Sequence, residues 1–209
     1  MSTIPSIAAK LSPEQSVLRT RRLTLRPLTQ GDAPLVQKLA GEKDVASTTR
    51  LIPHPYPSGM AEQWIRALPE LYQRAEMISW GVAMAEGPLL GTIRLTLNPV
   101  DNNAEMGYWI GKPFWNNGYC TEAARAVVDY GFEVLGLERI YANYLARNPA
   151  SGRVLHKLGM QQEGHLRRHR RKFGRYEDLV VCGLLKTEYR GTKRSATSTA
   201  PSSETTSAG

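Results

Sequence analysis

Apolar residues recur along the chain with two different periods, and the changes between these periods predict the order of the elements. Residues 23–26 alternate apolar and polar side chains, as a half-buried strand does. Apolar runs at 78–84, 90–97 and 104–110 are separated by a Glu-Gly-Pro turn at 86–88 and an Asp-Asn-Asn turn at 101–103. These three runs predict an antiparallel meander.

Helical spacing, with apolar residues three and four positions apart, marks four other segments. The first follows Asp32 and ends at Gly41, and the second covers 60–75, where Pro69 is expected to produce a kink. The strongest pattern covers 120–135 and is followed by Gly136 at the position of a C-terminal cap. A short helix over 149–158 ends before Gly159. The Pro-rich stretch 49–58 between the first two helices predicts an ordered loop.

The remaining apolar runs complete an α+β (mixed α/β) pattern. A strand is expected over 140–145, and the runs 160–166 and 178–185 predict a closing hairpin. The full order is strand, two helices, three strands, helix, strand, helix and two strands. Because this order mixes hairpins with helical crossovers, we expect one mixed sheet with helices on its faces.

The two ends of the chain differ from its centre. Residues 191–209 are dominated by Ser, Thr, Ala and Gly, a composition that buries too little apolar surface to offset the loss of chain entropy. Residues 1–20 show no sustained period. We therefore expect a loosely ordered N-terminal segment (1–20), one domain (21–190) and a disordered tail (191–209).

Composition narrows the class of protein. With 209 residues, 41% of them hydrophobic, the chain is long enough to bury a core. No apolar run approaches the roughly 18 residues of a membrane span, so a soluble, cytoplasmic protein is expected. Cys120 and Cys182 lack ligand spacing, and no pair among the four histidines has metal-ligand spacing backed by acidic residues, so neither a metal nor a disulfide framework is predicted.

Six basic residues and no acidic ones lie between His165 and Arg175, and we call residues 167–175 the basic arm. The arm accounts for most of the net charge of +8, so the charge of the whole chain is weak evidence for nucleic-acid binding. The arm is expected to be a solvated hairpin, with contact to an acidic substrate as the alternative.

The segment that carries the chemistry is 108–123, Tyr-Trp-Ile-Gly-Lys-Pro-Phe-Trp-Asn-Asn-Gly-Tyr-Cys-Thr-Glu-Ala. It places a Gly-containing turn between a strand end and a long amphipathic helix. A helix start of this kind presents unpaired N–H groups and the positive end of the helix dipole, so it binds phosphate. Gly118 lets the backbone approach an anion closely. One such glycine alone is weak evidence, because a single glycine at a strand-helix turn more often marks an ordinary turn.

Together with further blocks, this segment resembles the GNAT acyltransferase family, and within it the RimJ and RimL branch of ribosomal-protein alanine acetyltransferases. The resemblance spans about residues 21–189. It rests on Leu-Thr-Leu-Arg-Pro-Leu at 23–28, Glu-Met-Gly-Tyr-Trp-Ile at 105–110, the turn at 115–122, Asn-Pro-Ala-Ser at 148–151, Lys-Leu-Gly-Met at 157–160 and Glu-Gly at 163–164. It implies a mostly antiparallel sheet with a splay between the fourth and fifth strands, and acetyl transfer from acetyl-CoA to a primary amine.

The family's cofactor loop has the pattern Gln/Arg-x-x-Gly-x-Gly/Ala, onto which Trp115, Gly118 and Cys120 fall. Only Gly118 matches strictly, so most contacts are expected from backbone N–H groups. Cys120 is expected to pack in the helix and not to act as a reactive thiol. The resemblance assigns cofactor binding to the following residues: Trp109, Ile110, Asn116, Asn117, Gly118, Tyr119, Cys120, Thr121, Asn143, Asn148 and Ser151.

The resemblance also implies the catalytic roles. In the family the pantetheine arm lies in the splay, here between 105–110 and 140–145, and the amine attacks the thioester directly. A backbone N–H near Tyr108 or Trp109 is expected to stabilise the oxyanion. Glu105 is the candidate base, with a surface carboxylate at a strand end as an equal alternative.

The leaving thiolate needs a proton donor. Many members use a Tyr where this chain has Leu155, whereas the RimJ and RimL branch places a Ser that Ser151 matches. Asn148 matches an Asn that binds the pantetheine arm. Ser151 fits a helix-cap hydroxyl equally well.

The expected partners are acetyl-CoA, the amine of a peptide N-terminus or a small molecule, and a second copy of the chain in a homodimer. Residues 45–75 are expected to line the acceptor entrance. Two other functions fit the sequence: a ribosome- or nucleic-acid-binding protein that uses the basic arm, and an acyl-CoA-binding sensor with weak catalysis. Nucleic acid is the less favoured partner, because one hairpin neutralises only a few phosphates.

Overall fold

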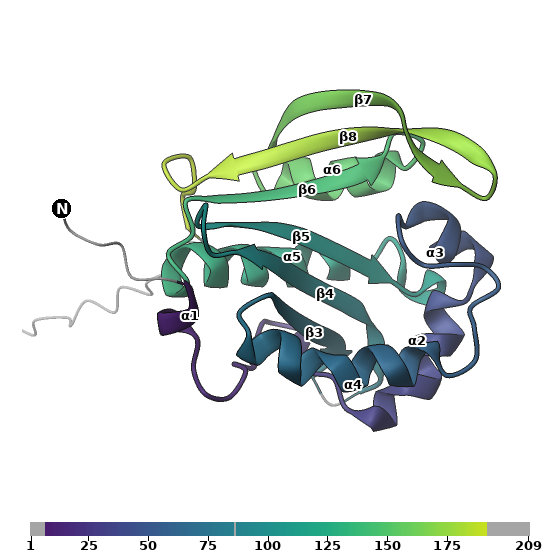
Figure 1. Cartoon of the computed structure of the whole chain (residues 1–209), viewed down its shortest axis with the longest axis horizontal. Coiled ribbons are helices and arrows are strands. Elements are labelled where there is room, and N and C mark those ends of the chain that lie inside the picture. Colours follow the sequence, from purple (N-terminus) through teal and green to yellow (C-terminus); the bar gives the residue numbers. More distant parts are fainter. Residues whose placement is uncertain (1–6, 86, 192–209) are drawn as a thin grey trace, which may run out of the picture.

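The computed structural model describes residues 7–85 and 87–191, which form one eight-stranded sheet with helices on both faces (Figure 1). The strand order is β1-β2-β3-β4-β5-β6-β8-β7. Every neighbouring pair is antiparallel except β5 and β6, which run parallel. The strands are β1 (Leu18–Arg19), β2 (Leu23–Pro27), β3 (Met77–Met84), β4 (Leu89–Asn98), β5 (Asn103–Ile110), β6 (Arg139–Leu145), β7 (Gln161–Lys172) and β8 (Arg175–Leu185). The predicted α+β class, with a mostly antiparallel sheet, is confirmed.

Two groups of helices cover the sheet. The helices are α1 (Ile7–Lys10), η1 (Gln30–Asp32), α2 (Ala33–Ala40), α3 (Lys43–Thr48), α4 (Met60–Gln73), η2 (Lys112–Phe114), α5 (Tyr119–Asp129), η3 (Tyr130–Val134) and α6 (Pro149–Lys157). Helices α2 and α4 pack on one face around Val36, Ile65 and Leu89, and α5 packs on the other around Val127. The sheet therefore has two differently lined faces.

The long helix after the Gly118 turn begins as predicted but changes its winding before it ends. Ala123, Ala124, Val127 and Val128 form the buried stripe of α5. Residues 130–134 then adopt a π-helical turn, where a continuous α-helix was predicted. This turn buries Tyr130, whose ring packs edge-on against the ring of Trp80, with the ring centres 5.5 Å apart. Gly136 follows with φ 62°, in agreement with its predicted capping position.

Three segments differ from the sequence predictions. Residues 7–10 and 18–19 lie in the segment predicted to be loosely held, but they form α1 and β1, and the Ile7 side chain is completely buried. Residues 43–48, for which no element was predicted, form α3. The closing hairpin extends through the basic arm, and Lys172 of that arm is only 7% exposed. The expected disordered tail lies, apart from residue 191, outside the described residues.

Among the described residues, no helix is long and apolar enough to cross a membrane.

The burial of Ile7 leads to a test of whether the N-terminal segment belongs to the core. Replacing Ile7 by Ala removes buried methyl groups and leaves a cavity, so the free energy of unfolding should fall by about 2 to 4 kcal/mol. Denaturant unfolding followed by circular dichroism measures this change. Val17→Ala is the control, because that side chain is 47% exposed and its loss should change stability little. Equal stability of the two variants would show that residues 7–10 do not pack on the core.

Candidate active site

The site is built around a place where two neighbouring strands separate. Strands β5 and β6 pair over four positions, from Asn103 opposite Arg139 to Met106 opposite Ala142. Both strands continue beyond this point, to Ile110 and Leu145, without pairing to each other. The predicted splay between these two strands is confirmed, and it leaves the inner edges of both strands open.

The hydrogen bonds on the outer edges show which backbone groups face the gap. The Gly111 N–H donates to the Leu90 carbonyl on β4, and the β4–β5 register has no bulge. Because bonded and non-bonded positions alternate in an antiparallel pair, Gly107 and Trp109 face β4, while Tyr108 and Ile110 face the gap. On β6, the Ala146 N–H donates to Asp178, so Asn143 faces the gap from the other side by the same alternation.

The cofactor loop lies at the open end of this gap. Gly118 adopts φ 77° and forms the N-cap of α5, so the turn uses a left-handed backbone that favours glycine. Asn116 is also left-handed, with φ 63°. Trp115, which departs from the Gln or Arg of the family pattern, donates its indole N–H to the Ile110 carbonyl at 2.6 Å. One of the open carbonyls of β5 is thereby already satisfied.

Arg22 contacts the same loop, and the sequence analysis did not identify it. Its Nε lies 2.6 Å from Glu122 Oε2, and its Nη1 donates to the Asn117 carbonyl at 3.0 Å. The guanidinium also lies 4.6 Å from the ring centre of Tyr119. Glu122 stands in the first turn of α5, where a free carboxylate would repel an anion, and Arg22 holds that carboxylate in an ion pair.

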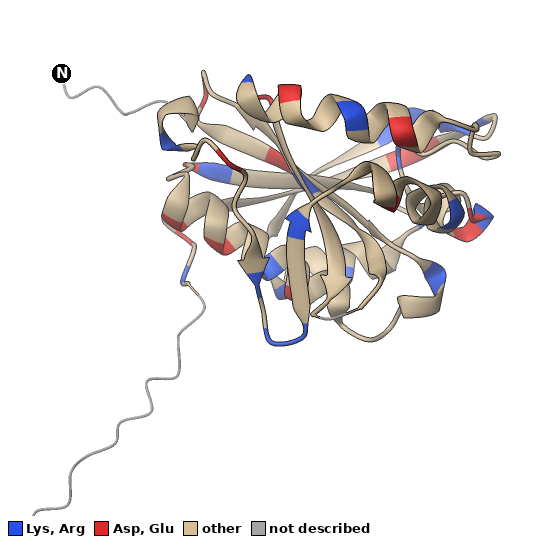
Figure 2. Ribbon diagram, turned by 90° about the horizontal axis from the view of Figure 1, so that it is seen from below, with Lys and Arg blue, Asp and Glu red and all other residues tan. Residues whose placement is uncertain are grey.

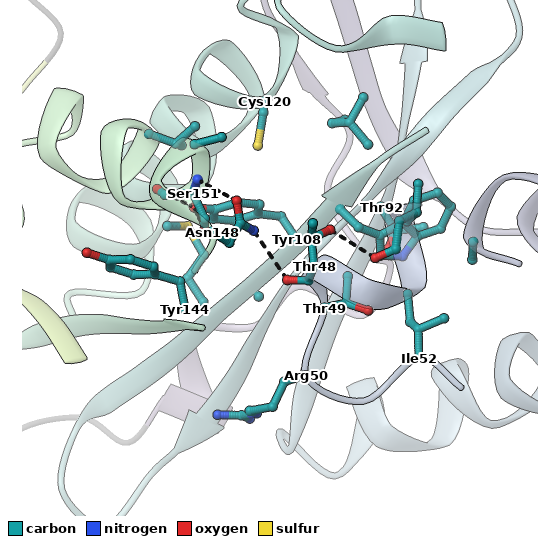
Figure 3. Close-up of a pocket in the computed structure, with 18 of the residues that line it drawn as sticks. Thr48, Thr49, Arg50, Ile52, Thr92, Tyr108, Cys120, Tyr144, Asn148 and Ser151 are labelled. Atoms are coloured by element: carbon teal, nitrogen blue, oxygen red, sulfur yellow. Dashed lines mark hydrogen bonds between the residues drawn. The ribbon is translucent and has the colours of Figure 1, made fainter. Parts of the chain in front are cut away.

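A cavity of about 570 Å³ connects the loop, the gap and the segment between α2 and α4. Figure 3 draws part of its lining, and the labelled residues come from α3 and the loop after it, from β4, β5 and β6, and from α5 and the start of α6. Nearly all of the predicted site residues lie on its wall. Those among its lining are Glu105, Tyr108, Trp109, Ile110, Asn116, Gly118, Tyr119, Cys120, Thr121, Asn143, Asn148 and Ser151, whereas Asn117 is not among them.

Two hydroxyl groups meet on the side of the cavity that faces α5 and α6. The Tyr108 hydroxyl lies 2.9 Å from Ser151 Oγ and also donates to the Ser151 carbonyl at 3.3 Å. Burial raises the pKa of Tyr108 well above its usual range, so this phenol stays protonated. Burial also raises the pKa of Cys120 to about 12, which agrees with its predicted role as a packing residue.

Asn148 holds the start of α6 in place. Its side-chain oxygen accepts from the Ser151 N–H at 3.3 Å, and its Nδ2 donates to the Thr48 carbonyl at 3.2 Å (Figure 3). The amide that the resemblance assigns to pantetheine is therefore an N-cap that also ties α6 to α3. Leu155, which stands where many relatives have a Tyr, is buried in the core.

Charged side chains gather on the opposite side of the gap. Glu105 Oε1 lies 2.7 Å from Arg50 Nη2 and accepts from Asn143 Nδ2 at 3.2 Å. The Glu105 side chain is 22% exposed, so it is a half-buried member of an ion pair and not a surface carboxylate. Arg94 of β4, which pairs with Gly107 of β5, is the third charged residue of this group. Sequence reasoning named Glu105 and Asn143 but not the two arginines.

The loop that carries Arg50 is fixed by distant parts of the chain. Lys172 Nζ donates to the Ile52 carbonyl, and Arg147 donates to the Ser47 carbonyl at 2.6 Å. Burial lowers the pKa of Lys172, and the nearby charge of Arg147 adds to this effect. The prediction of a solvated basic arm is thus wrong for Lys172, because the extended hairpin brings this residue against the loop.

Charges elsewhere are dispersed. In the view of Figure 2 basic and acidic residues both occur on the helices and strands, so the net charge of +8 does not form one continuous basic face there.

Within residues 7–85 and 87–191, no group of three or more His, Cys, Asp or Glu side chains could hold a metal ion.

Comparison with known proteins supports the family resemblance found in the sequence. Residues 22–161 match the model of the acetyltransferase (GNAT) domain. The "Uncharacterized N-acetyltransferase YoaA" of Bacillus subtilis (strain 168) is 35% identical over 172 residues, which is 81% of this chain and 97% of that protein. The "Putative ribosomal N-acetyltransferase YdaF" of the same organism is 38% identical over 109 residues, 52% of this chain and 60% of that protein.

A relative with a named acceptor and a solved structure extend the comparison. The spermidine N(1)-acetyltransferase of Vibrio cholerae is 28% identical over 174 residues, 80% of this chain and 95% of that protein. The crystal structure titled "Probable acetyltransferase" superposes with a TM-score of 0.77 at 30% identity and covers 83% of this chain and 99% of its own. With its open gap, its Gly118 helix start and these matches, the chain is a GNAT-family acyltransferase related to the ribosomal-protein N-acetyltransferases.

Proposed function

We propose that the protein transfers the acetyl group of acetyl-CoA directly to a primary amine, either a peptide N-terminus or a small molecule. The observation that carries this proposal is the open edge of β5 beside the N-terminus of α5, within one cavity. An unpaired strand edge binds an extended chain, and a helix start binds phosphate. The pantetheine arm and the pyrophosphate of CoA require this combination.

The proposed placement of the cofactor follows from the open backbone groups. The pyrophosphate lies against N–H groups of 116–121, and the pantetheine arm runs from there along β5 like an added strand. The Ile110 carbonyl already accepts from the Trp115 indole, so the Ile110 N–H is the group of this residue that binds the arm. The Tyr108 N–H is the last open donor before β5 and β6 pair, so we assign it to the thioester oxygen, where negative charge develops.

The amine nitrogen then attacks the thioester carbon, and the carbon–sulfur bond breaks. The thiolate takes a proton from Ser151, whose hydroxyl is held by Tyr108 at 2.9 Å. The attacking nitrogen releases one proton as the amide forms, and Ser151 regains a proton through water. Burial raises the pKa of Tyr108 well above its usual range, so this phenol keeps its proton and we assign it the role of positioning Ser151. Asn148 supports this arrangement through its bond to the Ser151 N–H.

Glu105 is the proposed acceptor of the ammonium proton, through water. At about 3.3 Å per strand residue, its Cα lies roughly 10 Å from that of Tyr108, too far for direct transfer at the reacting carbon. Both of its contacts fall on Oε1, which leaves Oε2 for a hydrogen-bonded water. The ion pair with Arg50 fixes this carboxylate at the cavity wall.

Nucleic-acid binding through the basic arm receives less support from the structure. Lys172 is buried against the loop after α3, and Arg168 lies over the Tyr176 ring at 4.8 Å, so the arm is partly used within the fold.

The direct test of the proposed function is acetyl transfer itself. The protein is incubated with acetyl-CoA and a panel of peptides, polyamines and amino acids, and mass spectrometry detects an acetyl group on nitrogen. We expect transfer to at least one amine together with release of free CoA thiol. Tight CoA binding without transfer to any amine would favour an acyl-CoA sensor instead.

The cofactor site predicts the effect of a charge at Gly118. Gly118→Asp places a carboxylate where the pyrophosphate approaches the helix start, so the Kd for CoA should rise about tenfold or more. Isothermal titration calorimetry measures the change. Gly59→Asp is a matched control, because Gly59 has φ 76° and caps α4, outside the cavity lining. Similar CoA affinity in both variants would contradict the placement of the pyrophosphate.

The hydroxyl pair predicts a separation of turnover from binding. Ser151→Ala should lower kcat by about tenfold or more, the usual scale for a positioned acid, while CoA affinity changes only a few-fold. Tyr108→Phe should have a smaller effect of the same kind, since it removes only the positioning group. Steady-state kinetics with parallel calorimetry distinguishes these parameters. Full kcat in Ser151→Ala would leave the Ser151 hydroxyl with a structural contact to Tyr108 alone.

A further inference from the structure

The charged side of the cavity holds more positive than negative charge. Arg50 and Arg94 stand there with Glu105 as the only carboxylate among the cavity-lining residues that the structure describes. Glu105 is paired with Arg50 at 2.7 Å, whereas no ion pair joins it to Arg94 within 4.0 Å. One guanidinium is therefore left without a partner of opposite charge.

Arg94 is also incompletely hydrogen-bonded. Its Nε is buried and has no hydrogen-bond partner among the described residues. Burial lowers the pKa of Arg94, Glu105 opposes this shift and Arg50 adds to it, so the charge is poorly solvated. A guanidinium remains protonated even so, and a buried cation without a partner is costly. An anion that enters the cavity would remove this cost.

The guanidinium lies beside the proposed reaction centre. A Cβ atom at position 107 would lie 3.3 Å from Arg94 Cζ. The glycine there leaves room for the guanidinium. Gly107 directly precedes Tyr108, with Cα atoms about 3.8 Å apart. A group bound to Arg94 would therefore lie within a few bonds of an amine that attacks a thioester at the Tyr108 N–H.

We propose that the acceptor is an amine that carries a carboxylate close to its nitrogen, as an amino acid does, and that Arg94 binds this carboxylate. Arginine presents paired N–H donors that match the two oxygens of a carboxylate. A polyamine would instead add positive charge to a wall that already has an excess. This inference rests on the proposed acetyl transfer and specifies its substrate class.

The test compares amino acids with their amides, which differ only in the carboxylate, and includes spermidine. In the unaltered protein, kcat/KM should be at least about tenfold higher for the favoured amino acid than for its amide or for spermidine. Arg94→Gln should abolish this preference, mainly through a higher KM for the amino acid, while the rate with the amide changes less than threefold. Arg94→Lys should retain part of the preference. Arg66→Gln, an exposed change on α4, should leave the preference intact.

The outcomes separate the two proposals. Faster acetylation of the amide or of spermidine, or an unchanged preference in Arg94→Gln, overturns the carboxylate inference and leaves acetyl transfer standing. No transfer to any amine of the panel contradicts the proposed function itself. CoA affinity, measured on each variant, should match that of the unaltered protein. If Arg94→Gln fails to bind CoA, the comparison of Arg94→Lys with the unaltered protein decides: an unchanged carboxylate preference overturns the inference.

Discussion

The separation of β5 from β6 after Met106 and Ala142 is the constraint on which the site depends. Each strand is already paired on its outer edge, β5 with β4 and β6 with β8, so neither can rotate to satisfy its inner edge without losing those bonds. Unpaired backbone groups away from water are costly. The cavity lies where the strands separate, so a ligand with amide groups of its own could pair with these open edges there.

The rest of the fold keeps the gap open and gives its two sides different chemistry. On one side, Asn148 fixes the start of α6 and Tyr108 holds Ser151, so hydroxyl groups face the proposed thioester. On the other side, α3 and the loop after it bring Arg50 to Glu105. Lys172 contacts that loop and Arg147 contacts α3, so the closing hairpin supports this side of the cavity through Lys172 although it lies at the edge of the sheet.

The sequence predicted most elements, because their burial follows local periods. The stripe on α5, the meander of β3 to β5 and the Gly118 turn are examples, and the splay followed from the family resemblance. The π-helical turn at 130–134 could not be predicted, since it depends on packing of Tyr130 against Trp80, 50 positions away. The burial of Ile7 could not be predicted either, because the residues around it show no sustained hydrophobic period.

The polar contacts of the site were harder to predict than its backbone. Glu105 and Ser151 were found through sequence blocks, but Arg22, Arg50 and Arg94 reach the site from other elements and carry no local signal. A charged residue in a single sequence is usually a surface residue, so these three could be identified only once the fold brought them together. Asn148 shows the converse, because the sequence named it and it lines the cavity, but its amide is engaged in capping.

Amide hydrogen exchange along β5, measured by NMR with and without CoA, tests the central claim most directly. Without CoA, the amides of Gly107, Trp109 and Gly111 should be protected by β4, and those of Tyr108 and Ile110 should exchange faster. Saturation with CoA should slow exchange at Ile110, and saturation with acetyl-CoA should slow it at Tyr108 as well, each by about tenfold or more. Exchange at these two positions that is unaffected by either ligand would contradict the assignment of the gap as the cofactor site.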